Sequence, residues 1–284
     1  MLCALLLTLP LLAGTAWADS RHDRLDEAWA AYQAGDNTKA RELFGSLAAE
    51  GEPEAHYGLG LMDANGLGAS RDDAAAASHF STAAEAGYAA AQDALGYMYD
   101  FGLGLPLNHD LAEYWYRKAV DGGDLNAKNN LAYSWISSGR RLDEALDLLH
   151  QVMAASPGVA AYLDSYGWAL YRLGRFREAL PPLCEAARRD PGHPEVQAHL
   201  GDALWRIGRK AEARQQWQRA LELAEQPSLL SQDGADFLHG VGIEGWRAEL
   251  TGRLTRGLGD TTPAAGSTAG EDMPLDDSCQ TPIS

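Results

Sequence analysis

The side chains best suited to bind a metal ion in this 284-residue sequence are eight histidines, which are scattered along the chain. No two of them are four residues apart, the spacing that places two imidazoles on one face of a helix. His56, His79 and His199 fall on predicted helices of different repeats. The histidine pattern therefore predicts no metal site.

Motifs of nucleophilic and phosphate chemistry are missing as well. The sequence contains no His-Glu-x-x-His, no Gly-x-Ser-x-Gly and no Walker-type loop. Gly-x-Gly pairs at 58/60, 66/68 and 102/104 have no preceding strand and recur with a repeat, so we interpret them as turn residues. The acidic residues Asp72-Asp73, Asp143-Glu144 and Glu178 stand at predicted helix starts, where they complement the helix dipole. We therefore expect a protein that is not an enzyme and holds no cofactor.

Small and apolar residues recur at fixed offsets, which indicates how the chain is organised. One step is 36 residues: Ala55, Gly60, Met62, Gly66, Gly68, Ala83 and Gly87 return as Ala91, Gly96, Met98, Gly102, Gly104, Ala119 and Gly123. Another step is 34 residues: Gly167, Leu170, Gly174, Ala179 and Ala186 return as Gly201, Leu204, Gly208, Ala213 and Ala220. Within each repeat the apolar residues have helical spacing, broken in the middle by glycine. Such a helical hairpin cannot bury its apolar face alone, so the pattern predicts several hairpins stacked together.

These motifs carry a family resemblance. Residues 160–226 resemble two tetratricopeptide repeats, and residues 54–123 resemble two of the slightly longer Sel-one-like repeats, marked by Gly66-Leu67-Gly68 and Gly102-Leu103-Gly104. Residues 19–53 and 124–156 resemble degenerate tetratricopeptide repeats. The resemblance implies an all-α fold, a right-handed α-solenoid of stacked helix-turn-helix repeats. It does not by itself imply one function, because this architecture serves many roles.

The C-terminal region departs from the repeat pattern. Residues 227–259 are predicted to form a linker and a last amphipathic helix that caps the apolar end of the stack, with Trp246, Leu250 and Leu254 on its apolar face. Pro181-Pro182 falls inside a predicted helix, which we expect to be kinked there. Residues 260–284 have the composition of a disordered acidic tail.

The N-terminal segment indicates export. Residues 1–18 carry no charged side chain and end in Ala16-Trp17-Ala18, which suits a signal peptidase, so we predict a signal peptide and a periplasmic or secreted protein. An uncleaved anchor is the alternative. No later stretch is long enough to span a membrane. After cleavage two cysteines remain: Cys184 is expected to be a buried free thiol, and a bridge to Cys279 stays open.

Charge limits the kinds of partner. The formal net charge is −17, which argues against nucleic acid because phosphate binding needs clustered Lys and Arg. Residues 19–124 contribute −12 and residues 125–259 contribute zero. An acidic surface could serve solubility alone, or it could steer a basic partner to the N-terminal half.

The remaining candidate for function is a surface. In tetratricopeptide arrays the first helices of successive repeats line a concave groove, and the resemblance implies a groove here that binds a protein or peptide. Its predicted side chains, called the predicted groove residues below, are Asn126, Asn129, Tyr133, Asp164, Trp168, Tyr171, Arg172, Asp202, Trp205 and Arg206. Trp168 and Trp205 could instead pack between repeats.

The leading interpretation is an exported, non-enzymatic adaptor of the bacterial envelope or periplasm. One alternative is a secreted host-interaction factor. Another is a protein that binds or hydrolyses penicillin-type ligands, as some Sel-one-like proteins do, but the paired cysteines of that subtype are absent from this sequence.

Overall fold

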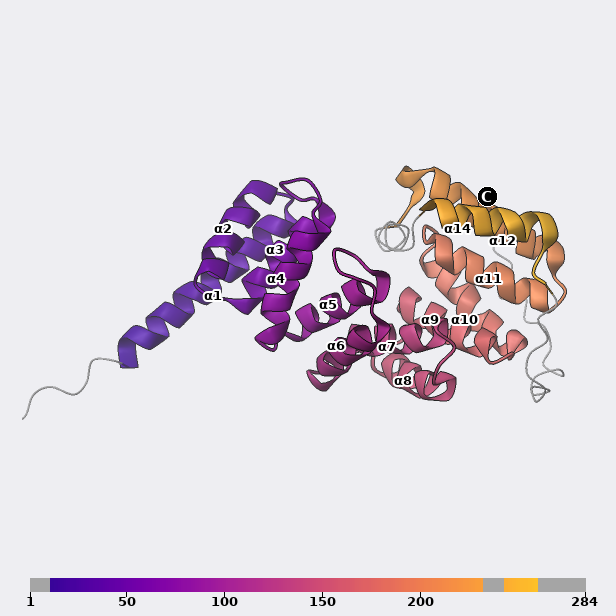
Figure 1. Ribbon diagram of the computed structural model, residues 1–284, viewed down its shortest axis with the longest axis horizontal. Coiled ribbons are helices and arrows are strands. Elements are labelled where there is room, and N and C mark those ends of the chain that lie inside the picture. Colours follow the sequence, from indigo (N-terminus) through magenta and orange to yellow (C-terminus); the bar gives the residue numbers. More distant parts are fainter. Residues whose placement is uncertain (1–10, 232–242, 260–284) are drawn as a thin grey trace, which may run out of the picture. The chain divides into compact units, whose positions relative to one another are not determined.

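The computed structural model describes residues 11–231 and 243–259, and the described part of the chain is built from helices with no strand (Figure 1). The fold class is therefore the predicted one, an all-α solenoid of paired helices. The helices are α1 (Leu11–Gln33), α2 (Asn37–Ala49), α3 (Pro53–Asn65), α4 (Asp73–Glu85), α5 (Ala89–Phe101), α6 (His109–Asp121), α7 (Leu125–Ser137), α8 (Leu142–Ala155), α9 (Ala160–Arg172), α10 (Phe176–Arg189), α11 (Pro194–Arg206), α12 (Lys210–Glu225), the 3-10 helix η1 (Pro227–Leu229) and α14 (Ile243–Arg256).

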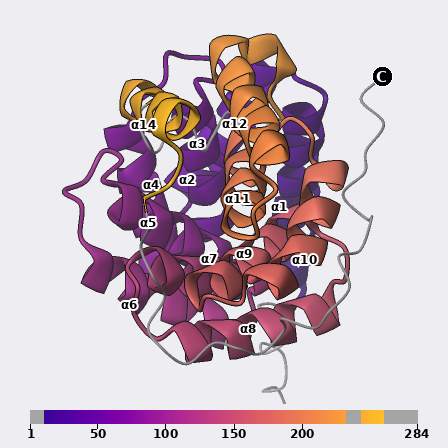
Figure 2. The same cartoon turned by 90° about the vertical axis from the view of Figure 1, so that its right-hand side faces the viewer.

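The chain divides into two compact units, one ending at Asp124 and the other starting at Leu125. The first unit contains the hairpins α1/α2, α3/α4 and α5/α6. The second contains α7/α8, α9/α10 and α11/α12, followed by α14; Figure 2 shows these helices from the side.

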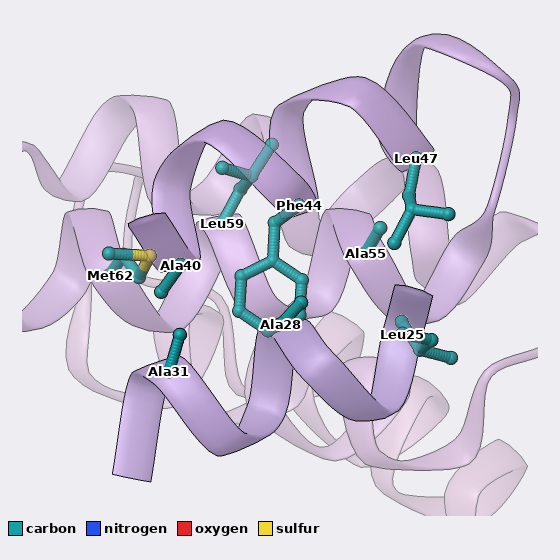
Figure 3. Packing of buried hydrophobic residues seen from close by; sticks show 9 residues of the cluster. All are labelled: Leu25, Ala28, Ala31, Ala40, Phe44, Leu47, Ala55, Leu59 and Met62. Atoms are coloured by element: carbon teal, nitrogen blue, oxygen red, sulfur yellow. The ribbon is translucent and has the colours of Figure 1, made fainter. Parts of the chain in front are cut away.

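Apolar side chains from successive helices form the core of the first unit. Phe44 of α2 lies between Ala28 of α1 and Leu59 of α3 in a cluster of nine buried residues (Figure 3). Phe44 and Met62 of this cluster have no exposed surface. Because α2 contributes to the interface on both sides, no hairpin has a complete core without its neighbour.

The recurring glycines have two separate roles. Gly60 lies inside α3, where an added Cβ would lie 2.5 Å from the Phe80 ring of α4, so glycine allows the two helices to approach closely. Gly58 also lies within α3, so the 58/60 pair does not form a turn as predicted, because both residues are needed at helix contacts. Gly66 and Gly102 do end helices, with φ of +66° and +68°, a backbone conformation that favours glycine.

The second unit repeats this arrangement with different aromatic residues. An added Cβ at Gly201 of α11 would lie 2.5 Å from the Trp217 indole of α12, and Trp217 has no exposed surface. The last described helix, α14, packs against α12 and buries Leu250 completely. This is the capping helix expected after the last repeat.

Helix α10 runs without interruption through Pro181 and Pro182. Leu180 and Leu183 are buried on its inner side while Pro181 is exposed, so packing supports the helix where two backbone N–H groups are missing. Cys184 on the same helix is buried and disulfide-bonded, which corrects the expectation of a free thiol. The other two cysteines of the sequence, at positions 3 and 279, lie outside the described residues.

The structure does not test the predictions made for the two ends of the sequence. Residues 1–10 of the predicted signal peptide and the whole of the predicted disordered tail, 260–284, lie outside the described residues. Helix α1 begins at Leu11 and so includes the last eight residues of the predicted signal peptide. Among the described residues, no helix has the length and apolar character needed to cross a bilayer.

Candidate functional site

The predicted groove residues all lie on the first helices of the three hairpins of the second unit. Asn126, Asn129 and Tyr133 are on α7; Asp164, Trp168, Tyr171 and Arg172 are on α9; Asp202, Trp205 and Arg206 are on α11. Their positions on first helices follow from the 34-residue repeat, since each residue of a repeat returns at the same place in the next hairpin.

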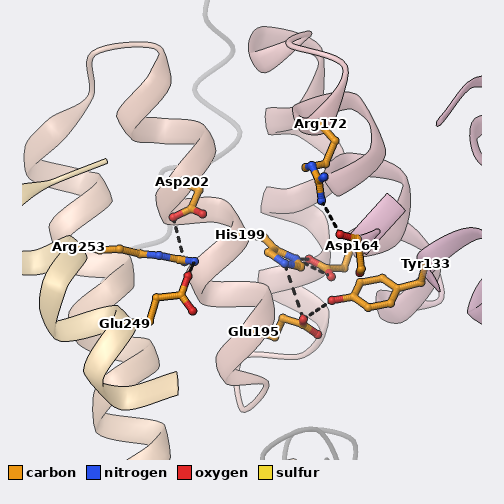
Figure 4. A network of polar contacts seen from close by, with 9 residues as sticks. Tyr133, Asp164, Arg172, Glu195, His199, Asp202, Glu249 and Arg253 are labelled. Atoms are coloured by element: carbon orange, nitrogen blue, oxygen red, sulfur yellow. Dashed lines mark hydrogen bonds and ion pairs between the residues drawn. The ribbon is translucent and has the colours of Figure 1, made fainter. Parts of the chain in front are cut away.

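A buried polar cluster links the three first helices (Figure 4). The Nδ1 atom of His199 on α11 lies 3.0 Å from Oδ2 of Asp164 on α9, and its Nε2 atom lies 3.8 Å from Oε1 of Glu195. The hydroxyl of Tyr133 on α7 donates a hydrogen bond to that same Glu195 oxygen. Asp164 and His199 are 4% and 5% exposed, so the pair is out of contact with bulk water. We refer to these four residues, Tyr133, Asp164, Glu195 and His199, as the histidine cluster.

The charges within the histidine cluster depend on each other. Burial by itself would lower the pKa of His199, but the charge of Asp164, its hydrogen bond and the charge of Glu195 outweigh that effect and raise the pKa. Burial raises the pKa of Glu195; Asp164 adds to the rise and His199 opposes it. Burial also raises the pKa of Tyr133, which therefore stays a hydrogen-bond donor. The cluster thus places the His199 imidazole between two carboxyl groups, and the proton affinities of His199 and Glu195 depend on each other.

Trp168 of α9 packs onto the same histidine. Its indole is nearly parallel to the His199 imidazole, with a ring-centroid separation of 3.9 Å, and to the Tyr171 ring at 4.6 Å. The sequence left open whether Trp168 packs between repeats or faces a ligand. It does pack between repeats, and it also keeps part of its surface exposed.

The C-terminal helix α14 contacts the predicted groove residues of α11. Asp202 accepts hydrogen bonds from Trp217 Nε1 at 2.8 Å and from Arg253 Nη1 of α14 at 3.1 Å. Burial raises the pKa of Asp202, and the charge of Arg253 opposes the rise.

Two further contacts follow the end of α14. Arg206 donates to the carbonyl of Gly259 at 3.0 Å, and an added Cβ at Gly257 would lie 2.0 Å from the Trp205 ring. Three predicted groove residues, Asp202, Trp205 and Arg206, therefore contact α14 and the residues that directly follow it.

The predicted groove residues on α7 are less occupied by contacts within the protein. Asn129 of α7 is 7% exposed, and its Oδ1 atom has no hydrogen-bond partner in the structure. Asn126, one turn earlier, is exposed and accepts a hydrogen bond from the Tyr162 hydroxyl at 2.7 Å. Arg172 of α9 donates to the carbonyl of Ser137 at 3.2 Å. A buried acceptor without a donor costs about 1–3 kcal/mol.

Sequence reasoning missed a second polar contact, in the first unit. His56 of α3 and His79 of α4 face each other with their Nδ1 atoms 3.1 Å apart. They lie on the two helices of one hairpin, which corrects the expectation that they belong to different repeats. Their separation of 23 residues is the length of one helix and its turn. That length was readable from the sequence, but the facing direction of the two rings was not.

The chemistry available at these places is limited. Both nitrogens of His199 face carboxylates, so neither is directed at a hydroxyl or thiol nucleophile. Among the described residues, no group of three or more His, Cys, Asp or Glu side chains is placed to hold a metal ion. The arrangement can therefore offer hydrogen bonds and aromatic surface to a bound chain.

Comparison with known families agrees with this architecture. The Sel1 repeat family matches residues 53–88 and 89–124, and the tetratricopeptide repeat family matches residues 136–194 and 166–228. Together these matches cover more than half of the chain. The chain belongs to the tetratricopeptide and Sel1 repeat proteins. Repeat proteins of these families are typical scaffolds for protein–protein interaction.

The curated relative is similar to this chain over a short segment. A TPR repeat-containing protein of Pseudomonas aeruginosa is 40% identical over 76 residues, which are 27% of this chain and 13% of that protein, so most of the relative's length is not matched.

Two solved structures share the repeat fold at low identity. The Sel1 repeat protein of Oxalobacter formigenes has a TM-score of 0.52 at 22% identity and covers 80% of this chain and 99% of its own. The protective antigen present in uropathogenic Escherichia coli strains has a TM-score of 0.57 at 22% identity, covering 87% of this chain and 58% of its own. At this identity the likeness shows the fold alone.

Proposed function

We propose that this repeat protein is an exported, non-enzymatic adaptor that binds an extended segment of a partner protein along α7 and α9. The observation that carries the proposal is the set of polar and aromatic side chains that α7 and α9 leave at the surface, with Asn126 exposed and Trp168 and Arg172 partly exposed. An extended peptide presents backbone N–H and C=O groups that have no intramolecular partner, and exposed amide and guanidinium groups can pair with them.

The surroundings of Asn129 support a peptide as the ligand. Asn126 and Tyr133 lie three residues before and four residues after Asn129, so the three side chains share one face of α7. Trp168 on the neighbouring first helix adds partly exposed aromatic surface. Aromatic and amide side chains together are typical of binding sites for protein segments. The far end of the row, on α11, is held by α14, so the proposed site is confined to α7 and α9.

Two features support an oxidising location outside the cytoplasm. Residues 1–18 have the apolar character and the small residues of a signal peptide. Cys184 is disulfide-bonded, and disulfides persist mainly in exported proteins. Fractionation of cells into cytoplasm, periplasm and medium, with mass spectrometry of the mature N-terminus, tests this part of the proposal. A cytoplasmic protein that retains Met1 would contradict it.

Selection from a displayed library of random peptides tests the binding site without knowing the partner. The wild-type protein is expected to enrich a family of related peptides, and Asn126→Ala is expected to lose that family. Lys128→Ala is the matched control, because Lys128 is a nearby residue on α7 and donates to Gln151 of α8, away from the site. If both variants enrich the same peptides as the wild type, the proposed site is wrong.

A further inference from the structure

The facing histidines of the first Sel1 repeat are not a feature of the repeat itself. The positions 36 residues after His56 and His79 hold Gln92 and Trp115. Gln92 uses its amide to donate to the carbonyl of Ala84 at 3.1 Å, so its role is to link α5 to α4 of the preceding hairpin. The two imidazoles therefore stand where the next repeat has groups with other roles.

The geometry of the pair suits two ligands of one metal ion. Zinc binds imidazole nitrogen at about 2.0–2.1 Å, and two such nitrogens at a tetrahedral angle lie about 3.3 Å apart. The observed Nδ1–Nδ1 distance is 3.1 Å, with ring centroids 5.3 Å apart and ring planes tilted by 39°. The separation of the two nitrogens is therefore close to that of two imidazole ligands on one zinc ion.

A carboxylate lies behind one of the rings, as is usual for histidines that bind metals. The Nε2 atom of His79 is 3.8 Å from Oδ2 of Asp63, whose other oxygen accepts a 2.8 Å hydrogen bond from Arg41 Nη1. Asp63 is 7% exposed and so is held in place. A carboxylate at the far nitrogen favours the tautomer in which Nδ1 is unprotonated and free to bind a cation. The Arg41–Asp63 pair adds no net charge beside the rings.

We propose that His56 and His79 form a two-histidine site for a divalent transition-metal ion, with water molecules as the remaining ligands. The imidazole ligands select Cu²⁺, Ni²⁺ and Zn²⁺ over Mg²⁺ and Ca²⁺, and Cu²⁺ is expected to bind most tightly. The His79 side chain is 31% exposed, so water can reach the metal. The net charge of −12 over residues 19–124 favours the approach of a cation. A bound ion would link α3 to α4 and stabilise that hairpin.

Titration calorimetry with CuCl₂, NiCl₂, ZnCl₂ and MgCl₂ tests the proposal on the full chain purified without a histidine tag. The wild type is expected to bind one Cu²⁺, Ni²⁺ or Zn²⁺ ion per chain at this site and no Mg²⁺. His56→Ala and His79→Ala are each expected to weaken binding at least tenfold. His22→Ala is the matched control, since His22 is a well-exposed histidine of the same unit, and it should bind as the wild type does.

A thermal measurement separates loss of the site from loss of the fold. Metal should raise the melting temperature of the wild type and of His22→Ala, because a ligand of the folded state stabilises it. It should leave the melting temperatures of His56→Ala and His79→Ala unchanged, while circular dichroism shows that both variants remain helical. If all three variants bind metal equally, or if the wild type binds none of the three ions, the pair is a hydrogen bond between two imidazoles and the proposal is wrong.

Discussion

His199 on α11 and Asp164 on α9 form a buried pair that connects two consecutive tetratricopeptide repeats, with Nδ1 of the imidazole 3.0 Å from the carboxylate. A hydrogen bond between two buried polar groups requires one alignment of the two helices, so this pair specifies how the repeats stack.

Removal of Asp164 should destabilise the second unit strongly. Asp164→Ala leaves the imidazole buried next to Glu195 without its main partner, and breaking a buried pair from one side costs about 3–5 kcal/mol. Urea denaturation followed by circular dichroism measures the loss. Asp147→Ala, an exposed carboxylate on α8, is the control and should change the free energy of unfolding by less than about 0.5 kcal/mol. Similar values for the two variants would show that the pair does not hold the repeats together.

The raised pKa values predict that stability falls as the pH rises. The folded protein holds the His199 proton more tightly than the unfolded chain does, so this stabilisation is complete below the ordinary pKa of 6.5 and is lost as the pH rises through the raised value. The raised pKa of Glu195 acts in the same direction from about pH 4.5 upward. The groups that face the imidazole are Asp164 from α9 and Glu195 and Asp202 from α11 itself.

Denaturation at a series of pH values from about 6 to about 9 checks this dependence. The free energy of unfolding of the wild type should decrease across the series. His199→Gln keeps a hydrogen-bond donor but cannot titrate, so its curve should be flatter. Parallel curves for the two proteins would contradict the assignment to His199.

Glycine is required at the helix crossings because a larger side chain does not fit between the two helices. Gly60→Ala places a methyl group 2.5 Å from the Phe80 ring, which is 3% exposed and cannot move away, so we expect a loss of about 1–3 kcal/mol. Gly45→Ala in α2 has no atom within 4 Å of the new methyl group and should gain about 0.5–1 kcal/mol from helix propensity. Melting temperatures of the two variants should therefore move in opposite directions from the wild type.

Arg253 should matter more to stability than its neighbour Arg247. Arg253→Ala leaves Asp202, which is 2% exposed, without its charged partner, and α14 then loses its polar contact with α11. We expect a loss of about 1–3 kcal/mol and faster proteolysis of α14.

Arg247→Ala is the matched control, because it removes an exposed ion pair with Glu225 that contributes about 0–1 kcal/mol. Limited proteolysis with fragment masses and denaturation curves compare the two variants. If α14 is cleaved equally fast in both, the contact with Asp202 does not hold the capping helix.

The sequence alone determined the repeat architecture of this protein. Helical hairpins, their 36- and 34-residue steps and the capping helix were predictable because apolar periodicity and small residues at crossings are local signals. The helix-ending glycines at 66 and 102 were predictable for the same reason. The placement of the predicted groove residues on first helices followed from counting along the repeat.

Only the tertiary structure decided which polar side chains meet. Tyr133 and Glu195 are 62 residues apart, and their contact depends on the stacking of three hairpins. His56 and His79 looked unrelated because helical spacing describes neighbours on one helix, whereas these rings come from two. The ion pair between Asp202 and Arg253 could not be predicted from the sequence either, because α14 follows a stretch without repeat spacing. Side-chain direction across an interface depends on packing of the whole stack, and residue spacing carries no information about it.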